Sequence, residues 1–140
     1  MSNVPVSTFL QRVLLADGAI SLASGLLMAL GGSWLEGLLG LPAWLLVPAG
    51  LSLFVYTAAA FWMARRASVP RLAVWVLIAI NVAWAVDCVA ITAGPWFAPT
   101  GLGQAFLAAH VITVLVFAEL QFMGLRRGDS AARTGQRQLA

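Results

Sequence analysis

The residues of this sequence that could do chemistry are a few polar side chains set inside long apolar stretches. Asp17, Asn81, Asp87, His110 and Glu119 each lie among Leu, Val, Ile and Ala, as in LAVWVLIAINVAWAVDCVAIT. Polar groups in such surroundings can relay protons, hold a ligand or bond one helix to another. The choice among these roles depends on which of the residues the fold brings to one place.

The composition predicts an integral membrane protein. Of 140 residues, 61% are hydrophobic and 9% are charged, whereas a soluble domain has roughly 25% charged residues. The net charge of +3 does not indicate nucleic acid, because the basic residues are not gathered with stacking aromatics in one arm or on one face. We therefore expect a lipid bilayer as the surroundings and no nucleic-acid partner.

Four apolar runs predict four membrane-spanning helices, at about 9–31, 42–64, 71–94 and 102–125. Each run is near the ~20 residues that cross a hydrocarbon core, and the short loops between them predict an all-α, antiparallel up-down bundle. The loops GSWLEGLLGLP and GPWFAPTG contain no Lys or Arg, so the positive-inside rule predicts cytoplasmic termini. All eight basic residues are arginines that flank the runs: Arg12, Arg65, Arg66, Arg71, Arg126, Arg127, Arg133 and Arg137.

The remaining segments complete a single transmembrane domain over residues 1–127. Ser33 to Glu36 has the pattern of a capping box, which predicts a short interfacial helix starting there. The segment 128–140, GDSAARTGQRQLA, is polar and almost without large apolar residues, so we expect a disordered cytoplasmic tail.

The sequence predicts no metal site, no cofactor and no catalytic motif. It has one His and one Cys, Cys88, and its carboxylates are scattered over several helices in no ligand spacing. We find no P-loop, Rossmann glycine pattern or nucleophile elbow. A haem would need an axial partner for His110 from a second protomer.

The depth of the polar residues can be estimated from their numbers. In adjacent antiparallel helices, positions at one level have a constant sum of residue numbers, here roughly 73 for the first two helices and 138 for the first and last. Asp17, Tyr56, Asn81 and Glu119 fit one inner layer by this rule. His110 and Glu119 are nine residues apart on opposite helix faces, so Glu119 faces either the first helix or a second protomer.

An outer layer pairs Asp87 with His110, at matched depth across the third and fourth helices. Ser24 and other small residues lie opposite them, and Trp84 lies between the two layers. We expect Asp87 and His110 to touch, directly or through one water, at the mouth of a small cavity. The alternative to a functional role is that the polar residues of both layers only form hydrogen bonds that hold the helices together.

With LLADGAISLASGLL, LLGLPAWLL, NVAWAVD and VFAELQFMGLRR, the chain resembles a loose set of small four-helix bacterial inner-membrane proteins with no assigned function. The resemblance implies a multi-pass protein of that membrane and no particular chemistry. The chain is also similar in architecture to small multidrug-resistance exporters, with Asp17 where their first-helix Glu stands. It lacks their Ala-Glu motif, and its arginine asymmetry argues against dual-topology insertion.

These observations lead to two main hypotheses for function. The first is a membrane-embedded binding or accessory subunit whose polar layers fix helix packing and which docks on a partner or on itself. The second is a small proton-coupled transporter that uses Asp17 and Glu119, or Asp87 and His110. An enzyme acting on lipids or quinones, with Asp87 and His110 as a general-base pair, is a third and more distant hypothesis, so the sequence favours a protein that is not an enzyme.

Overall fold

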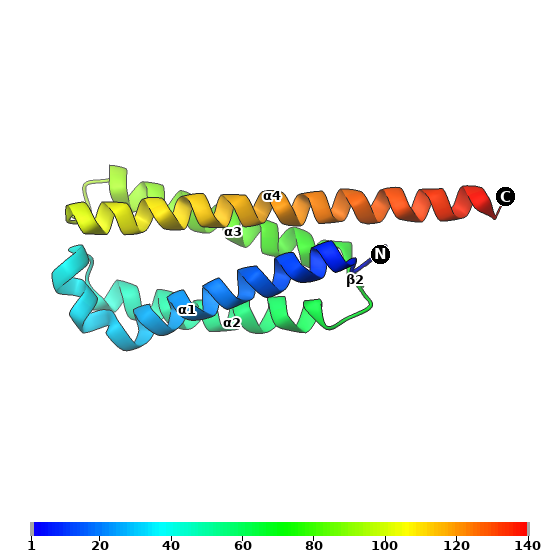
Figure 1. Ribbon diagram of the computed structural model, residues 1–140. Helices are drawn as coiled ribbons and strands as arrows, with labels where there is room; N and C mark the ends of the chain where they lie inside the picture. The colour runs from blue at the N-terminus through cyan, green and yellow to red at the C-terminus, as the bar shows by residue number, and fades with distance from the viewer. Residues whose placement is uncertain (1, 140) are drawn as a thin grey trace.

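The computed structural model describes residues 2–139 as four long helices and two short strands. Figure 1 shows the helices side by side and alternating in direction, and all four are long and apolar enough to cross a membrane. This confirms the predicted all-α four-helix fold. The elements are β1 (Asn3–Pro5), α1 (Thr8–Leu39), α2 (Ala43–Ala64), β2 (Ser68–Pro70), α3 (Arg71–Ala93) and α4 (Gly101–Gln138).

The four helices begin within one residue of their predicted starts, and α1 and α4 are each opened by a side-chain cap. Ser7 Oγ accepts a hydrogen bond from Leu10 N, and Thr100 Oγ1 accepts one from Gly103 N. α1 ends at Leu39 and is capped by Gly40, whose φ of 66° is left-handed and suits glycine. The starts of the four membrane-spanning helices were therefore predicted to within one residue.

The predicted interfacial helix at Ser33–Glu36 is wrong, because α1 continues through this segment to Leu39. The residues are good helix formers following an established helix, so extending α1 avoids the cost of a new nucleus. The Glu36 carboxylate accepts instead from Ala43 N and so caps the start of α2.

The predicted disordered tail also differs from the structure, in which α4 continues to Gln138. Its 38 residues correspond to about 57 Å, well beyond a hydrocarbon core of ~30 Å. In Figure 1 the last turns of α4 project past the rest of the bundle. An existing helix extends through Ala, Arg and Gln at little cost, which polarity alone did not indicate.

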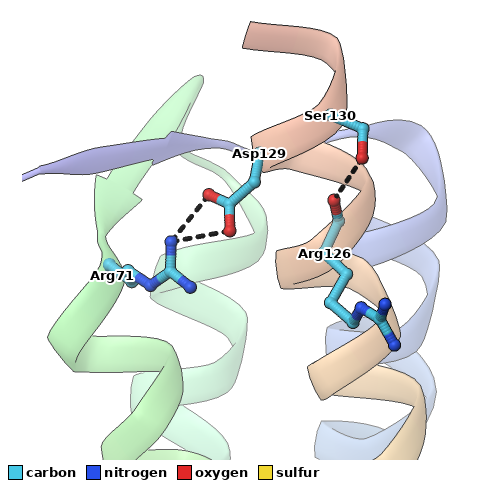
Figure 2. Close-up of polar contacts among 4 residues, drawn as sticks. All are labelled: Arg71, Arg126, Asp129 and Ser130. Atoms are coloured by element: carbon cyan, nitrogen blue, oxygen red, sulfur yellow. Dashed lines mark hydrogen bonds and ion pairs between the residues drawn. The ribbon is translucent and has the colours of Figure 1, made fainter. Parts of the chain in front are cut away.

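A small clasp closes the end of the bundle where the arginines gather, which we call the arginine end. β1 and β2 pair antiparallel with Val4 opposite Val69, and both valines are buried. Arg71 Nη1 donates to both carboxylate oxygens of Asp129 at 2.7 Å, which links the start of α3 to α4 (Figure 2). This sheet was not predicted, because each strand has only three residues, too few to show an alternating pattern.

The helices pack as two hairpins joined along one side. α1 packs on α2, α3 packs on α4, and the hairpins meet where α1 touches α4, while α2 and α3 hardly touch. α1 and α2 come closest at Gly25 and Gly50, where a Cβ on Gly50 would lie 2.7 Å from Ala29 N and 2.9 Å from Gly25 O. Both atoms belong to the backbone and cannot move aside.

We expect Gly50→Ala to lower the free energy of unfolding by about 1–3 kcal/mol, because its methyl group would force the two backbones apart. Gly37 is the matched control, since it is also helical and a Cβ there would meet nothing within 4 Å. Gly37→Ala should be neutral or stabilising by up to about 1 kcal/mol. Unfolding by denaturing detergent measures both; equal effects would contradict a backbone contact at Gly50.

Candidate functional site

A buried polar cluster ties all four helices together at one level. Asp17 of α1 is 2% exposed, and its Oδ2 accepts from the hydroxyl of Tyr56 in α2. Asn81 Nδ2 of α3 donates to Asp17 Oδ2 at 3.3 Å and to the Tyr56 hydroxyl at 2.8 Å. The structure thus brings together three of the four residues predicted for the inner layer.

The fourth member of the cluster is Gln121, which the sequence did not single out. It is fully buried, and its Nε2 donates to Asp17 Oδ2 at 2.6 Å and to the Tyr56 hydroxyl at 3.3 Å. Ser21 Oγ, one turn along α1, lies 3.4 Å from Asp17 Oδ1. Every partner of Asp17 donates to it, so its acceptor capacity is used within the protein.

Glu119 does not join the cluster, and its assignment to the inner layer needs correction. Its side chain is exposed, whereas Gln121 is buried. Residues two apart in a helix point about 200° away from each other, so only one of the two can face α1.

Two features of the sequence point to Gln121 as the α4 partner of Asp17. Its number and that of Asp17 add to 138, the expected sum for these two helices, whereas Glu119 gives 136. Gln121 also lies on the buried face of α4 with Ala118, Leu125 and Gly128 at helical spacing. The depth sum and the helical spacing therefore both point to Gln121.

His110 has one satisfied ring nitrogen and one without a partner. Its Nδ1 lies 3.0 Å from the carbonyl oxygen of Phe106, one turn earlier in α4. A carbonyl can only accept, so Nδ1 carries the hydrogen and Nε2 of the neutral ring presents a lone pair. Nε2 is buried and, among residues 2–139, has no hydrogen-bond partner.

The predicted contact of Asp87 with His110 also needs correction in its direct form. Within the described part of the chain no hydrogen bond or ion pair joins them, and Asp87 is exposed. The backbone carbonyl of Phe106 on the same helix is within easier reach of the ring. Asp87 and His110 do line one cavity of about 310 Å³, toward the loop between α3 and α4, which we call the distal cavity.

A second cavity, of about 200 Å³, connects the polar cluster with His110. We call it the central cavity. Most of its wall is apolar, and Trp84 lines both cavities, as expected for a residue between the two layers. Its lining residues with polar side chains, besides Trp84, are Asp17, Ser21, Ser24, Tyr56, Asn81, His110 and Thr113.

The site contains no cluster suited to a metal ion. Among residues 2–139, no group of three His, Cys, Asp or Glu side chains lies close enough to hold one. Cys88 is buried and unpaired with another cysteine, as its single occurrence requires. What the arrangement can do is hold a small molecule by hydrogen bonds in an otherwise apolar space.

Comparison with known proteins gives no family for this chain. No protein-family model matches it, and neither the curated proteins nor the solved structures gave a significant match. The resemblance to small bacterial inner-membrane proteins therefore stays a prediction.

Removing the Tyr56 hydroxyl should destabilise the bundle. Tyr56→Phe keeps the ring but removes the hydroxyl that donates to Asp17 and accepts from the side-chain amides of Asn81 and Gln121. We therefore expect the free energy of unfolding to fall by about 1–3 kcal/mol. Ser52→Ala is the control, because this exposed hydroxyl bonds only Ala49 O in its own helix. Detergent unfolding that shows similar small losses for both would contradict a cluster that holds the helices together.

Proposed function

We propose that the protein is a membrane-embedded binding subunit that receives a small, largely apolar ligand with a hydrogen-bond donor. The observation that carries this proposal is the buried, unpartnered Nε2 of His110 in the wall of the central cavity. A buried acceptor without a partner is costly, and a ligand hydroxyl or amine would satisfy it. The apolar wall suits a ligand that enters from the bilayer.

The polar cluster supports a structural role for Asp17 in this function. All four helices contribute to it, and Asp17 is already bonded by Tyr56, Asn81 and Gln121. Such a cluster fixes the rotation and depth of each helix, and so keeps His110 beside the cavity.

A proton-coupled transporter is the second candidate, since Asp17 and His110 line one central cavity. It would require Asp17 to exchange a proton with that cavity while bonded to three side chains. The binding role needs no such exchange and is therefore preferred.

We also infer that the protein associates with a second copy or with a partner in the membrane. Glu119 has an exposed side chain on an otherwise apolar face of α4, beside exposed Leu115, Val116 and Phe122. A carboxyl group facing lipid alone is costly, and a contact with another helix would relieve that cost.

Ligand retention tests the binding role. Protein purified from its native membrane in mild detergent should yield a stoichiometric small molecule on extraction and mass spectrometry. His110→Phe keeps a flat ring but removes Nε2, so that molecule should be lost. Thr92→Val is the control, because Thr92 bonds only the Cys88 carbonyl and lines neither cavity. Equal retention by both variants would refute binding at His110.

We further propose that the arginine end lies in the cytoplasm of a bacterial inner membrane, in line with the positive-inside rule. In a Cys88→Ala background, a cysteine at Ser68 should react only with a reagent admitted to the cytoplasm. A cysteine at Gly101, where a side chain meets open space, should react from outside intact cells. The opposite pattern would reverse the orientation.

A further inference from the structure

α2 and α3 are consecutive helices that make few direct contacts, and a groove lies between them. The groove has a volume of about 800 Å³ and an almost wholly apolar lining, including Val55, Ala59, Val76 and Leu77. It runs from Trp62 and Pro70 at the arginine end to Tyr56 and Trp84 at mid-depth. Its volume falls within the ~300–1,000 Å³ of ligand pockets.

An open pocket lined in part by two arginines adjoins the groove at its arginine end. It has a volume of about 530 Å³ and is lined by Ala58, Phe61, Trp62, Arg65 and Arg66. Trp62 lines both spaces, and the guanidinium carbon of Arg66 lies 4.6 Å from the centre of the Trp62 ring. The aromatic ring thus fixes a cation at the junction of the two spaces.

The guanidinium N–H groups of Arg65 and Arg66 are not used by a carboxylate in the described part of the protein. Within residues 2–139 the one ion pair is Arg71 with Asp129, so neither Arg65 nor Arg66 has a carboxylate partner. They follow the end of α2, where cations complement the helix dipole. That effect does not occupy the guanidinium hydrogens, which remain free to bind an anion from the solvent or the membrane surface.

We propose that this bipartite surface binds one anionic phospholipid, with its phosphate on Arg65 and Arg66 and an acyl chain in the α2–α3 groove. Charge complementarity selects the headgroup, since guanidinium groups bind phosphate through paired hydrogen bonds. The apolar groove accepts the chain and leads it to the Tyr56 side of the polar cluster. The groove shares Leu53, Tyr56, Ile80 and Trp84 with the central cavity, but neither the groove nor the pocket at Arg65 and Arg66 is lined by His110, the residue proposed to bind the hydrogen-bonding ligand.

Native mass spectrometry of the purified full chain tests the proposal. The detergent-solubilised protein is titrated with phosphatidylglycerol and, separately, with phosphatidylcholine of the same acyl chains. We expect one phosphatidylglycerol per chain, bound more tightly than phosphatidylcholine. The double variant Arg65→Gln/Arg66→Gln should weaken the binding of phosphatidylglycerol by about 25-fold, because each cation near an anionic lipid contributes about fivefold.

Two matched controls separate the site from general attraction. Arg133→Gln/Arg137→Gln removes the same charge from the projecting part of α4 and should leave binding unchanged. Ala59→Phe fills the groove and should weaken both lipids, whereas Ala79→Phe, at an exposed alanine outside the groove, should weaken neither. Circular dichroism checks that each variant is folded.

Three results would overturn the proposal. If both arginine double variants weaken phosphatidylglycerol binding equally, the attraction is non-specific. If Ala59→Phe binds lipid as well as the unchanged protein does, the acyl chain does not lie in the groove. Equal affinity for the two lipids would mean that the headgroup is not recognised. His110→Phe should not affect phosphatidylglycerol, so failure of the ligand site and failure of the lipid site can be told apart.

Discussion

A carboxyl group buried among four apolar helices has to find its hydrogen bonds within the protein, since lipid offers none. Asp17 finds them in one residue from each other helix: Tyr56, Asn81 and Gln121. This requirement fixes the rotation of all four helices and their relative depth. The bond from Asn81 to Tyr56 also joins α3 to α2, which otherwise hardly touch.

Hydropathy and residue numbering predicted most of the fold and part of the site. Apolar runs located the four helices, because a bilayer demands a minimum length of apolar chain. The constant sum of residue numbers at one level correctly predicted that Asp17, Tyr56 and Asn81 lie at the same depth, because every helix rises by the same distance per residue. Rotation about a helix axis is harder to predict from an apolar sequence, since most positions on every face are hydrophobic, and this is why the sequence analysis did not single out Gln121.

Contacts that depend on short or local geometry could not be predicted. The β1–β2 clasp rests on three-residue strands, and the link between Arg71 and Asp129 joins residues far apart in sequence. His110 bonds a carbonyl of its own helix rather than Asp87, a choice made by the side-chain conformation. The central and distal cavities and the α2–α3 groove, all lined by Trp84, arise because two hairpins meet along one edge and diverge at the other.

The wide separation of the cluster's members along the chain matters while the protein is being made. Tyr56 follows Asp17 by 39 residues, and Gln121 follows it by 104. At ~5–20 residues per second, a ribosome reaches Gln121 about 5–20 s after Asp17. Until α3 is made, Tyr56 and Ser21 are the only partners of the Asp17 carboxyl group; Asn81 follows Asp17 by 64 residues, and Gln121 is the last partner to be made. The nascent hairpin must therefore be sheltered by the insertion machinery, or stay near the membrane surface where water can solvate Asp17, until α3 and α4 arrive.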